Sequence, residues 1–207
     1  MKLHWSSRSP YVRKVMICVY ELGLADKIER IPSVVSLTKP NAEVMRDNPL
    51  GRIPTLILDD GRVLHESLLI CEYLDSQYNG KLFPPLLPNK GEARWTALRR
   101  HALGNGLLDA LLLWRSEIGK PVARQTPEWL TTFALKTRNA LEVMEADADA
   151  LARTPFDIGH VGIGTALAYL DFRFADFGWR TGHPRTDAWM QQFLQRESVV
   201  KTTFIDA

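Results

Sequence analysis

The chain has 207 residues, of which 45% are hydrophobic, and its 26 Lys and Arg residues nearly balance its 24 Asp and Glu residues. This length allows one large domain or two compact ones, and the apolar content is sufficient for a buried core, which argues against intrinsic disorder. The net charge of +2 gives no sign of a nucleic-acid partner. Cys18 and Cys71 are too few for a disulfide-rich scaffold or a four-cysteine zinc site.

The remaining global features predict a cytoplasmic protein without a metal or membrane partner. The first residues lack a signal peptide's apolar stretch, and no window approaches the ~18 apolar residues that span a bilayer. The five histidines lack a metal-ligand spacing, and no glycine-rich phosphate loop is present. Arg94, Arg99 and Arg100 are expected on a solvated face or in dimer contacts.

The first eighty residues alternate extended runs with helical patterns, which predicts a small mixed sheet with helices on its faces. An Asp-Gly turn between two β-rich runs predicts a hairpin. Gly23 is expected to end the first helix, and Asn79 and Gly80 the third. Strands are expected near residues 3–5, 28–31, 53–58 and 62–64, and helices near residues 10–22, 40–45 and 67–78.

The sequence pattern changes after residue 80. Three prolines between residues 80 and 90 predict an extended connector, and only helical patterns follow it. The expected helices cover residues 92–117, 131–151, 157–174 and 185–197. The organisation is therefore predicted as an α/β domain (1–79), a linker (80–90) and an all-α domain (91–207).

Ser9 and Pro10 open the first predicted helix. Serine is a favoured N-cap and proline a favoured first helical residue, so the pair has a purely structural explanation. A helix N-terminus after a strand also attracts an anion, and a serine hydroxyl there can donate to a bound thiolate. Lowering a thiol pKa by two units from ~8.5 requires about 2.7 kcal/mol of preferential stabilisation. The residues alone leave both roles open.

The bond between Ile53 and Pro54 lies where a loop meets the predicted hairpin. A trans proline at the start of an edge strand is the ordinary arrangement, and a cis bond is the rarer alternative. A cis bond would turn the N–H and C=O of Ile53 outward, where a peptide-like ligand can pair with them.

Glu66 and Ser67 precede the third predicted helix. Ser67 is expected to be the N-cap of that helix. As a binding pair, Glu66 would accept from an ammonium group, while the Ser67 hydroxyl and nearby helix N–H groups would bind a carboxylate. The pair would suit the α-amino-acid end of a small ligand.

In this order and spacing, these elements resemble the glutathione transferase superfamily, with serine at the active-site turn. Residues 9–14 (SPYVRK) look like its active-site turn, residues 48–56 (NPLGRIPTL) its cis-proline segment, and Glu66-Ser67 its γ-glutamyl-binding pair. Residues 166–172 (ALAYLDF) resemble the buried helix of its C-terminal domain. The likeness implies a thioredoxin-like N-terminal domain, an all-α helical-bundle C-terminal domain and a homodimer.

The resemblance also implies a role for each motif residue. Ser9 would be the catalytic residue that faces the glutathione sulfur. Ile53 would pair its backbone with the cysteinyl moiety, and Arg52 would reach the glycine carboxylate. The implied glutathione-binding residues are Arg52, Ile53, Pro54, Glu66 and Ser67, and the implied substrate pocket contains Tyr11, Leu108 and Trp114.

The chain departs from redox members of the wider fold at the active-site turn. Those members have Cys-Pro-Tyr-Cys where this chain has residues SPYV, so dithiol exchange through residue 9 is excluded. Cys18 and Cys71 are expected to be buried structural thiols. Ser7 is the alternative thiolate donor if the turn is shifted.

The start of the predicted buried helix also departs from the pattern of the superfamily that the chain resembles. Asp157 remains as its cap, but the capping partner is His160. Gly159, Gly162 and Gly164 would each weaken the helix by ~1 kcal/mol relative to alanine, unless close packing requires them.

The leading hypothesis is a detoxifying enzyme that conjugates glutathione, as co-substrate, to small hydrophobic electrophiles. One alternative is a non-catalytic binding or regulatory protein of the same fold. Another is a glutathione-dependent peroxidase or dehalogenase, which would use the same ligand site.

Overall fold

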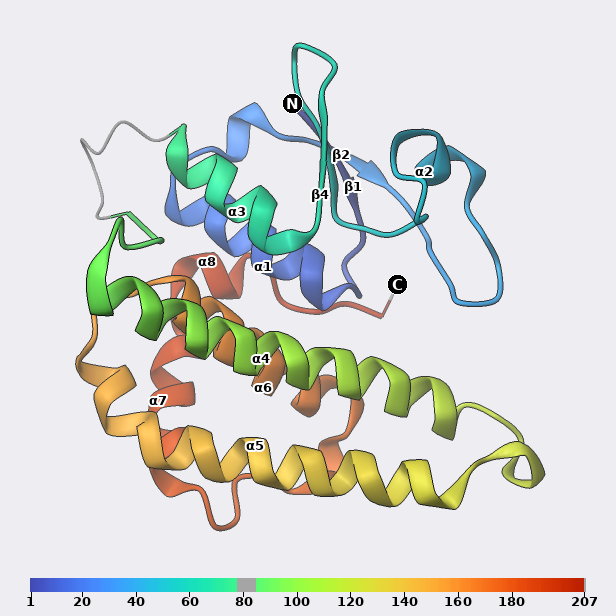
Figure 1. Ribbon diagram of the computed structural model, residues 1–207, viewed down its shortest axis with the longest axis vertical. Helices are drawn as coiled ribbons and strands as arrows, with labels where there is room; N and C mark the ends of the chain where they lie inside the picture. Colours follow the sequence, from blue (N-terminus) through green and yellow to red (C-terminus); the bar gives the residue numbers. More distant parts are fainter. Residues whose placement is uncertain (78–84, 207) are drawn as a thin grey trace. The chain divides into compact units, whose positions relative to one another are not determined.

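The computed structural model describes residues 1–77 and 85–206 (Figure 1). The chain forms two compact units: an N-terminal unit of residues 1–87 with 197–207, and a helical unit of residues 88–196. The sequence did not predict that residues 197–207 group with the N-terminal unit. The predicted helix end at Asn79 and Gly80, and the predicted linker up to residue 84, lie outside the described residues. The domain limits at 79 and 91 remain a prediction.

A four-stranded mixed sheet forms the centre of the N-terminal unit. Its order is β2-β1-β3-β4, with β1 parallel to β2 and antiparallel to β3, and β3 antiparallel to β4. The predicted hairpin is confirmed, because Leu56 lies opposite Leu64 and the turn places Gly61 at a φ of 85°. The strands are β1 (Lys2–Trp5), β2 (Glu29–Pro32), β3 (Thr55–Ile57) and β4 (Val63–His65).

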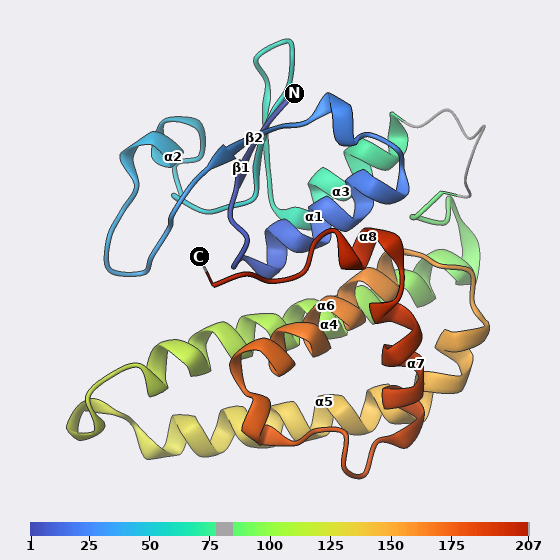
Figure 2. The same ribbon diagram turned by 180° about the vertical axis from the view of Figure 1, so that it is seen from behind.

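Three helices accompany the sheet: α1 (Pro10–Glu21), α2 (Ala42–Asp47) and α3 (Ser67–Ser76). Helices α1 and α3 lie side by side on one face of the sheet, and α2 lies on the other (Figures 1 and 2). Leu3 and Leu56 are register partners in the sheet, and both are fully buried. The apolar residues at helical spacing in α1 are also buried, so the periodicity identified the core face correctly.

The C-terminal tail (residues 197–206) returns to α1 (Figure 2). It begins with the short helix α8 (Glu197–Val200), whose Ser198 hydroxyl donates to Glu21. The N–H of Ile205 donates to the carbonyl of Ser7 at 3.4 Å. The helix expected over residues 185–197 is confirmed up to residue 194, but its predicted end is three residues too late. Helix α7 (Pro184–Leu194) ends first, and α8 is a separate element of the other unit.

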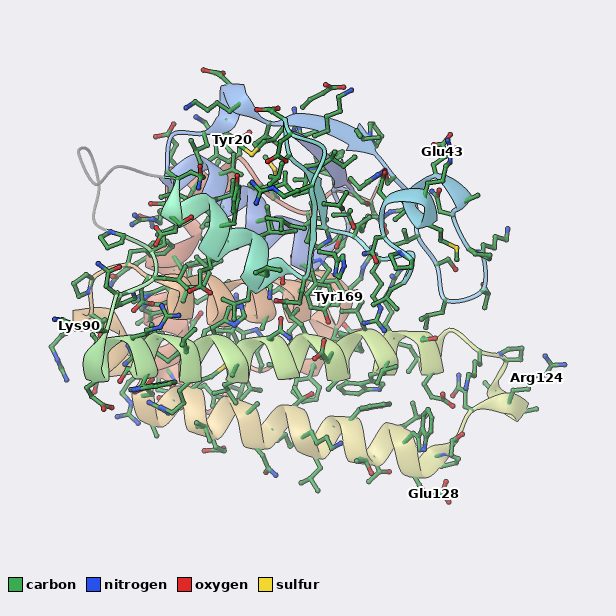
Figure 3. The ribbon with its side chains drawn as sticks, turned by 45° about the horizontal axis from the view of Figure 1, so that its top comes forward. Tyr20, Glu43, Lys90, Arg124, Glu128 and Tyr169 are labelled. Atoms are coloured by element: carbon green, nitrogen blue, oxygen red, sulfur yellow. The ribbon has the colours of Figure 1, made fainter. Side chains whose placement is uncertain are left out.

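The helical unit contains α7 and three longer helices: α4 (Gly91–Ile118), α5 (Pro127–Arg153) and α6 (Ile158–Arg173). Short 3₁₀ helices lie at Val122–Arg124 and Ala175–Phe177 in this unit, and at Ala25–Lys27 in the N-terminal unit. Figure 3 labels Arg124 and Glu128 at the connection between α4 and α5. Glu117 holds this connection, because its carboxylate accepts from the Thr126 N–H at 2.8 Å and from Lys120 at 2.6 Å. No helix within residues 1–77 and 85–206 is long and apolar enough to cross a bilayer.

Helices α4 and α6 approach each other at two glycines. A Cβ on Gly104 would lie 2.4 Å from the carbonyl carbon and oxygen of Gly162, and one on Gly162 would lie 2.8 Å from the Cα of His101. A Cβ on Gly164 would lie 2.3 Å from the Phe193 ring. Close packing therefore requires these glycines, as the sequence allowed, and they are not simple weak points of the helix.

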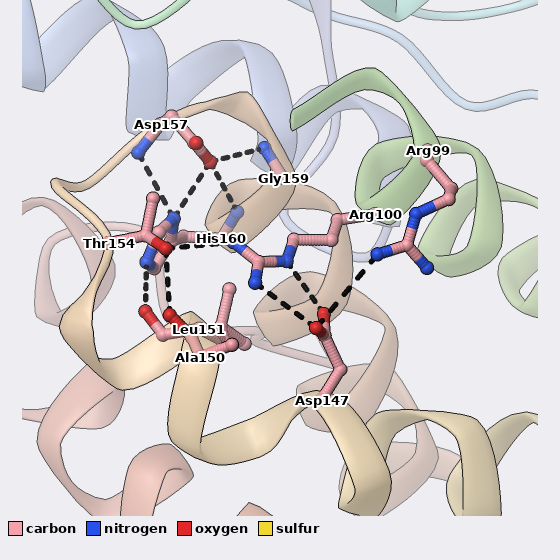
Figure 4. A network of polar contacts seen from close by, with 9 residues as sticks. All are labelled: Arg99, Arg100, Asp147, Ala150, Leu151, Thr154, Asp157, Gly159 and His160. Carbon is pink, nitrogen blue, oxygen red and sulfur yellow. Dashed lines mark hydrogen bonds and ion pairs between the residues drawn. The ribbon is translucent and has the colours of Figure 1, made fainter. Parts of the chain in front are cut away.

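Polar contacts join α4, α5 and the start of α6 (Figure 4). The Asp157 carboxylate accepts from the N–H groups of Gly159 at 2.9 Å and His160 at 3.2 Å, which confirms the predicted cap. Arg100 is 3% exposed and donates to Asp147 at 2.6 and 3.2 Å, so its expected place on a solvated face is wrong. Because the guanidinium is buried and bidentate, it contributes to the packing of α4 on α5.

Glu145 on α5 caps α7 from a neighbouring helix. Its carboxylate accepts from the Thr186 N–H at 2.8 Å, from the Thr186 hydroxyl at 2.7 Å and from the Arg185 N–H at 3.1 Å. Burial alone would raise the pKa of Glu145, but these hydrogen bonds outweigh it and lower the pKa to about 2.

Replacing Gly104 with alanine should destabilise the helical unit, because the new methyl group has no room against the α6 backbone. We expect Gly104→Ala to lower the free energy of unfolding by about 1–3 kcal/mol in urea titrations. The control is Gly106→Ala on the same helix, where nothing lies within 4 Å of the added Cβ. That variant should match the wild type or gain up to ~1 kcal/mol. Equal stability of the two variants would contradict the close approach.

Replacing Glu145 with glutamine should remove a pH-dependent source of stability. The folded-state pKa of about 2 lies below the ordinary 4.5, so the carboxylate stabilises the fold above pH 4.5 and loses this effect as pH falls toward 2. The difference in urea midpoint between wild type and Glu145→Gln should be largest at neutral pH and shrink toward pH 2. Glu128→Gln, at an exposed residue of α5, is the control, and a constant Glu145 difference would refute the assignment.

Candidate functional site

Ser9 caps the N-terminus of α1. Its Oγ accepts from the Val12 N–H at 3.3 Å, and Pro10 occupies the first helical position, which confirms the predicted N-cap. A hydroxyl that accepts from the helix still has its own proton to donate. The hydrogen bonds of the described residues include no acceptor for that proton. Ser9 is half-buried, so the hydroxyl lies at the positive end of the α1 dipole without being sealed in the core.

The peptide bond between Ile53 and Pro54 is cis, so the ordinary trans alternative is wrong. Asn48 stabilises this segment, because its buried side chain donates to the Arg52 carbonyl at 3.1 Å and to the Thr55 hydroxyl at 3.0 Å. Ile53 is itself buried, yet none of the hydrogen bonds within the described residues uses its main-chain N–H or C=O. Buried main-chain groups are normally paired, so these two are available to a ligand.

Glu66, and not Ser67, is the N-cap of α3. Its Oε2 accepts from the N–H groups of Leu68 at 3.0 Å and Leu69 at 3.2 Å, and Ser67 is the first helical residue. The prediction was displaced by one residue because the longer carboxylate reaches the N–H groups that a serine cap would reach. The Ser67 hydroxyl donates to Oε1 of Glu66 at 3.1 Å.

Glu66 has an unusual backbone and a stabilised charge. Its φ of 83° is the only positive value at a non-glycine residue in the described part of the chain. Burial by itself would raise the pKa of Glu66, but the Leu68 and Leu69 N–H groups and the charge of Lys14 lower it overall. Glu66 is therefore ionised at neutral pH, as acceptance from an ammonium group requires.

The other predicted site residues lie in different surroundings. Arg52 is exposed, and Tyr11 is half-buried, with its ring 5.2 Å from Lys14 Nζ. Leu108 is fully buried within the helical unit. The Trp114 ring packs on Phe174, with 4.7 Å between ring centroids. Tyr11 and Trp114 belong to different units, so the substrate pocket stays a prediction.

The alternative thiolate donor, Ser7, has another partner. Its hydroxyl donates to the carbonyl of Ile205 in the C-terminal tail at 2.9 Å. This contact directs the Ser7 proton toward the tail and leaves Ser9 as the serine at the helix terminus.

The two cysteines lie in the core and away from the start of α1. Cys18 and Cys71 are both free and buried, as predicted. The hydrogen bond to Cys71, and then burial, raise the pKa of the Cys18 thiol well above its usual range. Within the described residues, no group of three His, Cys, Asp or Glu side chains could hold a metal ion.

Sequence patterns assigned no role to two residues that organise the site. Asn48 stands first in the NPLG stretch, and its role under the cis peptide depends on hydrogen bonds that the stretch does not reveal. Lys14 is fully buried on α1, and its charge lowers the pKa of Glu66. A lysine on the otherwise apolar face of a helix was the available signal.

Comparison with known proteins identifies the family of the chain. Residues 8–77 match the family model of the glutathione S-transferase N-terminal domain. The GST-like protein YibF of Escherichia coli K12 is 30% identical over 207 residues, and the match covers 98% of each chain. The chain belongs to the glutathione S-transferase superfamily.

Two crystal structures of superfamily members extend this relationship to the fold. A glutathione transferase family member from Pseudomonas fluorescens Pf-5, with bound glutathione, is 40% identical, with a TM-score of 0.93 over 97% of each chain. A glutathione S-transferase from Methylobacillus flagellatus KT with bound GSH is 28% identical, with a TM-score of 0.88 over 99% of each chain. This superfamily member therefore has the predicted thioredoxin-like domain followed by an all-α domain.

The backbone of Glu66 can be tested with two substitutions that remove the same carboxylate. Glu66→Ala loses the cap and keeps a side chain at positive φ, whereas Glu66→Gly loses the cap and removes that constraint. We expect the glycine variant to be the more stable by roughly 1 kcal/mol in urea unfolding. If the alanine variant is the more stable of the two, Glu66 carries no backbone strain.

Proposed function

We propose that the protein is a glutathione transferase that binds glutathione in its N-terminal unit and conjugates the thiolate to small hydrophobic electrophiles. The observation that carries the proposal is Ser9, whose hydroxyl accepts from the α1 terminus and retains a proton for a ligand. The bound glutathione of the related Pseudomonas fluorescens and Methylobacillus flagellatus proteins supports the choice of co-substrate.

Each end of the tripeptide has a chemically suitable partner. The free N–H and C=O of buried Ile53 fit the peptide groups of the cysteinyl moiety, beside Pro54. The ionised Glu66 fits the ammonium group of the γ-glutamyl end, and the exposed Arg52 can reach the glycine carboxylate.

The Ser67 hydroxyl already has an intramolecular acceptor. It donates to Glu66 at 3.1 Å, so a ligand carboxylate must take over this donation or bind through main-chain N–H groups at the start of α3. Exchange of one carboxylate acceptor for another conserves the number of hydrogen bonds. Binding can therefore place a carboxylate at Ser67 without leaving the hydroxyl unpaired.

The proposed reaction needs little covalent chemistry from the protein. The glutathione thiol loses its proton to solvent, and Ser9 stabilises the thiolate by donating its hydroxyl proton in a hydrogen bond. With an aryl chloride, the thiolate forms a C–S bond, the C–Cl bond breaks, and chloride leaves. The rate gain comes from thiolate stabilisation and from proximity of the two reactants.

The proposed electrophile pocket contains Tyr11, Leu108 and Trp114. Trp114 is half-buried, whereas Leu108 is a core side chain. A homodimer and the domain limits at residues 79 and 91 are part of the same proposal.

The decisive experiment compares Ser9→Ala with Ser7→Ala. We expect Ser9→Ala to lower kcat/KM for glutathione and an aryl chloride by about tenfold or more, and to shift the pH–rate profile upward, because the thiolate loses a donor. Ser7→Ala should retain the rate, since the Ser7 proton is directed to Ile205. An unchanged rate in Ser9→Ala would remove Ser9 from the mechanism.

Thermal unfolding with millimolar glutathione separates the alternatives. A rise in Tm shows binding of the folded protein. Binding without turnover of aryl halides or peroxides would favour the non-catalytic protein, and peroxide or dehalogenation turnover alone would favour that enzyme class. The absence of both glutathione binding and turnover would refute the proposal.

A further inference from the structure

A cavity lies in the N-terminal unit, apart from the proposed glutathione-binding residues. It has a volume of about 160 Å³ and is bordered by the residues that follow β1, by α1 and by the C-terminal tail. Ser9, Arg52, Ile53, Glu66 and Ser67 do not line it. Figure 2 shows the tail running along α1 toward the start of that helix. The cavity is therefore a separate feature of this unit.

The charge of the cavity wall has one sign. Arg13, Arg30 and Lys201 line it, and no Asp or Glu is present among its lining residues in the described part of the chain. Three cations around one concavity concentrate positive potential there. Such a wall favours an anionic occupant.

Arg13 is the most informative of the three cations. It is 5% exposed, its Nε has no hydrogen-bond partner, and Nη2 donates to the Val199 carbonyl only at 3.4 Å. The guanidinium lies over the Phe204 ring, 4.4 Å from its centroid, and no ion pair of the described residues includes it. Burial lowers the pKa of Arg13 to about 10. A buried charge without a carboxylate is costly, and an anion in the adjoining cavity would offset that cost.

The two other cations are accessible. Arg30 is exposed and lies over the Trp5 ring, 5.3 Å from its centroid, with no ion pair in the described part of the chain. Lys201 pairs with Glu197 at 2.6 Å, but both side chains are at least half exposed, so this pair is weak and exchangeable. Arg30 is therefore free to turn toward a ligand, and Lys201 can exchange the Glu197 carboxylate for one.

Hydroxyl groups complete the wall. Ser6, Ser7, Thr202 and Thr203 line the cavity together with the cations. The hydroxyls of Ser7, Thr202 and Thr203 already donate to main-chain carbonyls, so of these four hydroxyls that of Ser6 has its proton left for a ligand. The Ser6 Oγ accepts from the Arg8 N–H at 3.4 Å and retains its proton for donation. Guanidinium, ammonium and hydroxyl donors are the groups that bind phosphate and carboxylate oxygens.

We propose that this cavity binds a small oxyanion, a phosphate or carboxylate group, between Arg13, Arg30 and Lys201. A volume of about 160 Å³ is several times the ~30 Å³ of a water molecule, so a group of this size fits. The site is independent of the proposed transferase function, because it shares no residue with the glutathione-binding set.

The test is calorimetric titration of the full chain with inorganic phosphate at constant ionic strength, with and without glutathione. We expect phosphate to bind in both cases. The double variant Arg30→Gln/Lys201→Gln should bind at least about tenfold more weakly, because it removes two accessible cations. Lys136→Gln, at an exposed lysine of α5, is the matched control and should bind like the wild type.

A second variant and a second anion complete the test. Arg13→Met should abolish binding, with its Tm measured to show that it folds. A parallel titration with acetate distinguishes a carboxylate ligand from phosphate, since only the preferred group binds tightly. Absent binding of both anions, equal affinity in the double variant, or displacement of phosphate by glutathione would each overturn the proposal.

Discussion

The contact between the α4 and α6 backbones at Gly104 and Gly162 is the constraint on which the helical unit depends. Residues 158–170 of α6 are all buried, so this helix must be enclosed on every side. Enclosure is possible only where a neighbour comes close, and the absence of side chains at the crossing allows it. The Asp157 cap and the Arg100–Asp147 pair then determine where α6 begins and how α5 packs beside α4.

In the N-terminal unit, main-chain conformation positions the groups proposed to bind the ligand. Ser9 lies at a helix terminus, Ile53 precedes a cis proline, and Glu66 has a positive φ. Each position leaves polar groups of a loop or helix end directed away from regular hydrogen bonding. Hydrogen bonds stabilise these conformations. Buried Asn48 donates to the Arg52 carbonyl, and the Glu66 carboxylate accepts from the first N–H groups of α3. A peptide ligand suits this arrangement because it brings main-chain groups of its own.

Patterns local in sequence predicted most of these elements. The spacing of Val12, Val15 and Val19 identified the buried face of α1, and the Asp-Gly turn identified the hairpin. Local sequence patterns could not predict interactions between segments that lie far apart in the chain. Nothing near Arg100 indicates that Asp147 will meet it, and residue type alone cannot distinguish a serine cap from a glutamate cap one residue earlier. The family resemblance, and not the residues by themselves, indicated the cis bond at Pro54.

The return of the C-terminal tail to α1 has a consequence for synthesis of the chain. The N-terminal unit includes the segment from residue 197 onward, so its packing is complete only after this segment has been synthesised. Until then the surface of α1 that Val199 and Phe204 cover is open, including the buried guanidinium of Arg13. The N-terminal unit begins to be synthesised first, yet it cannot complete its fold until the tail is present. The helical unit is contiguous in sequence and can fold before it.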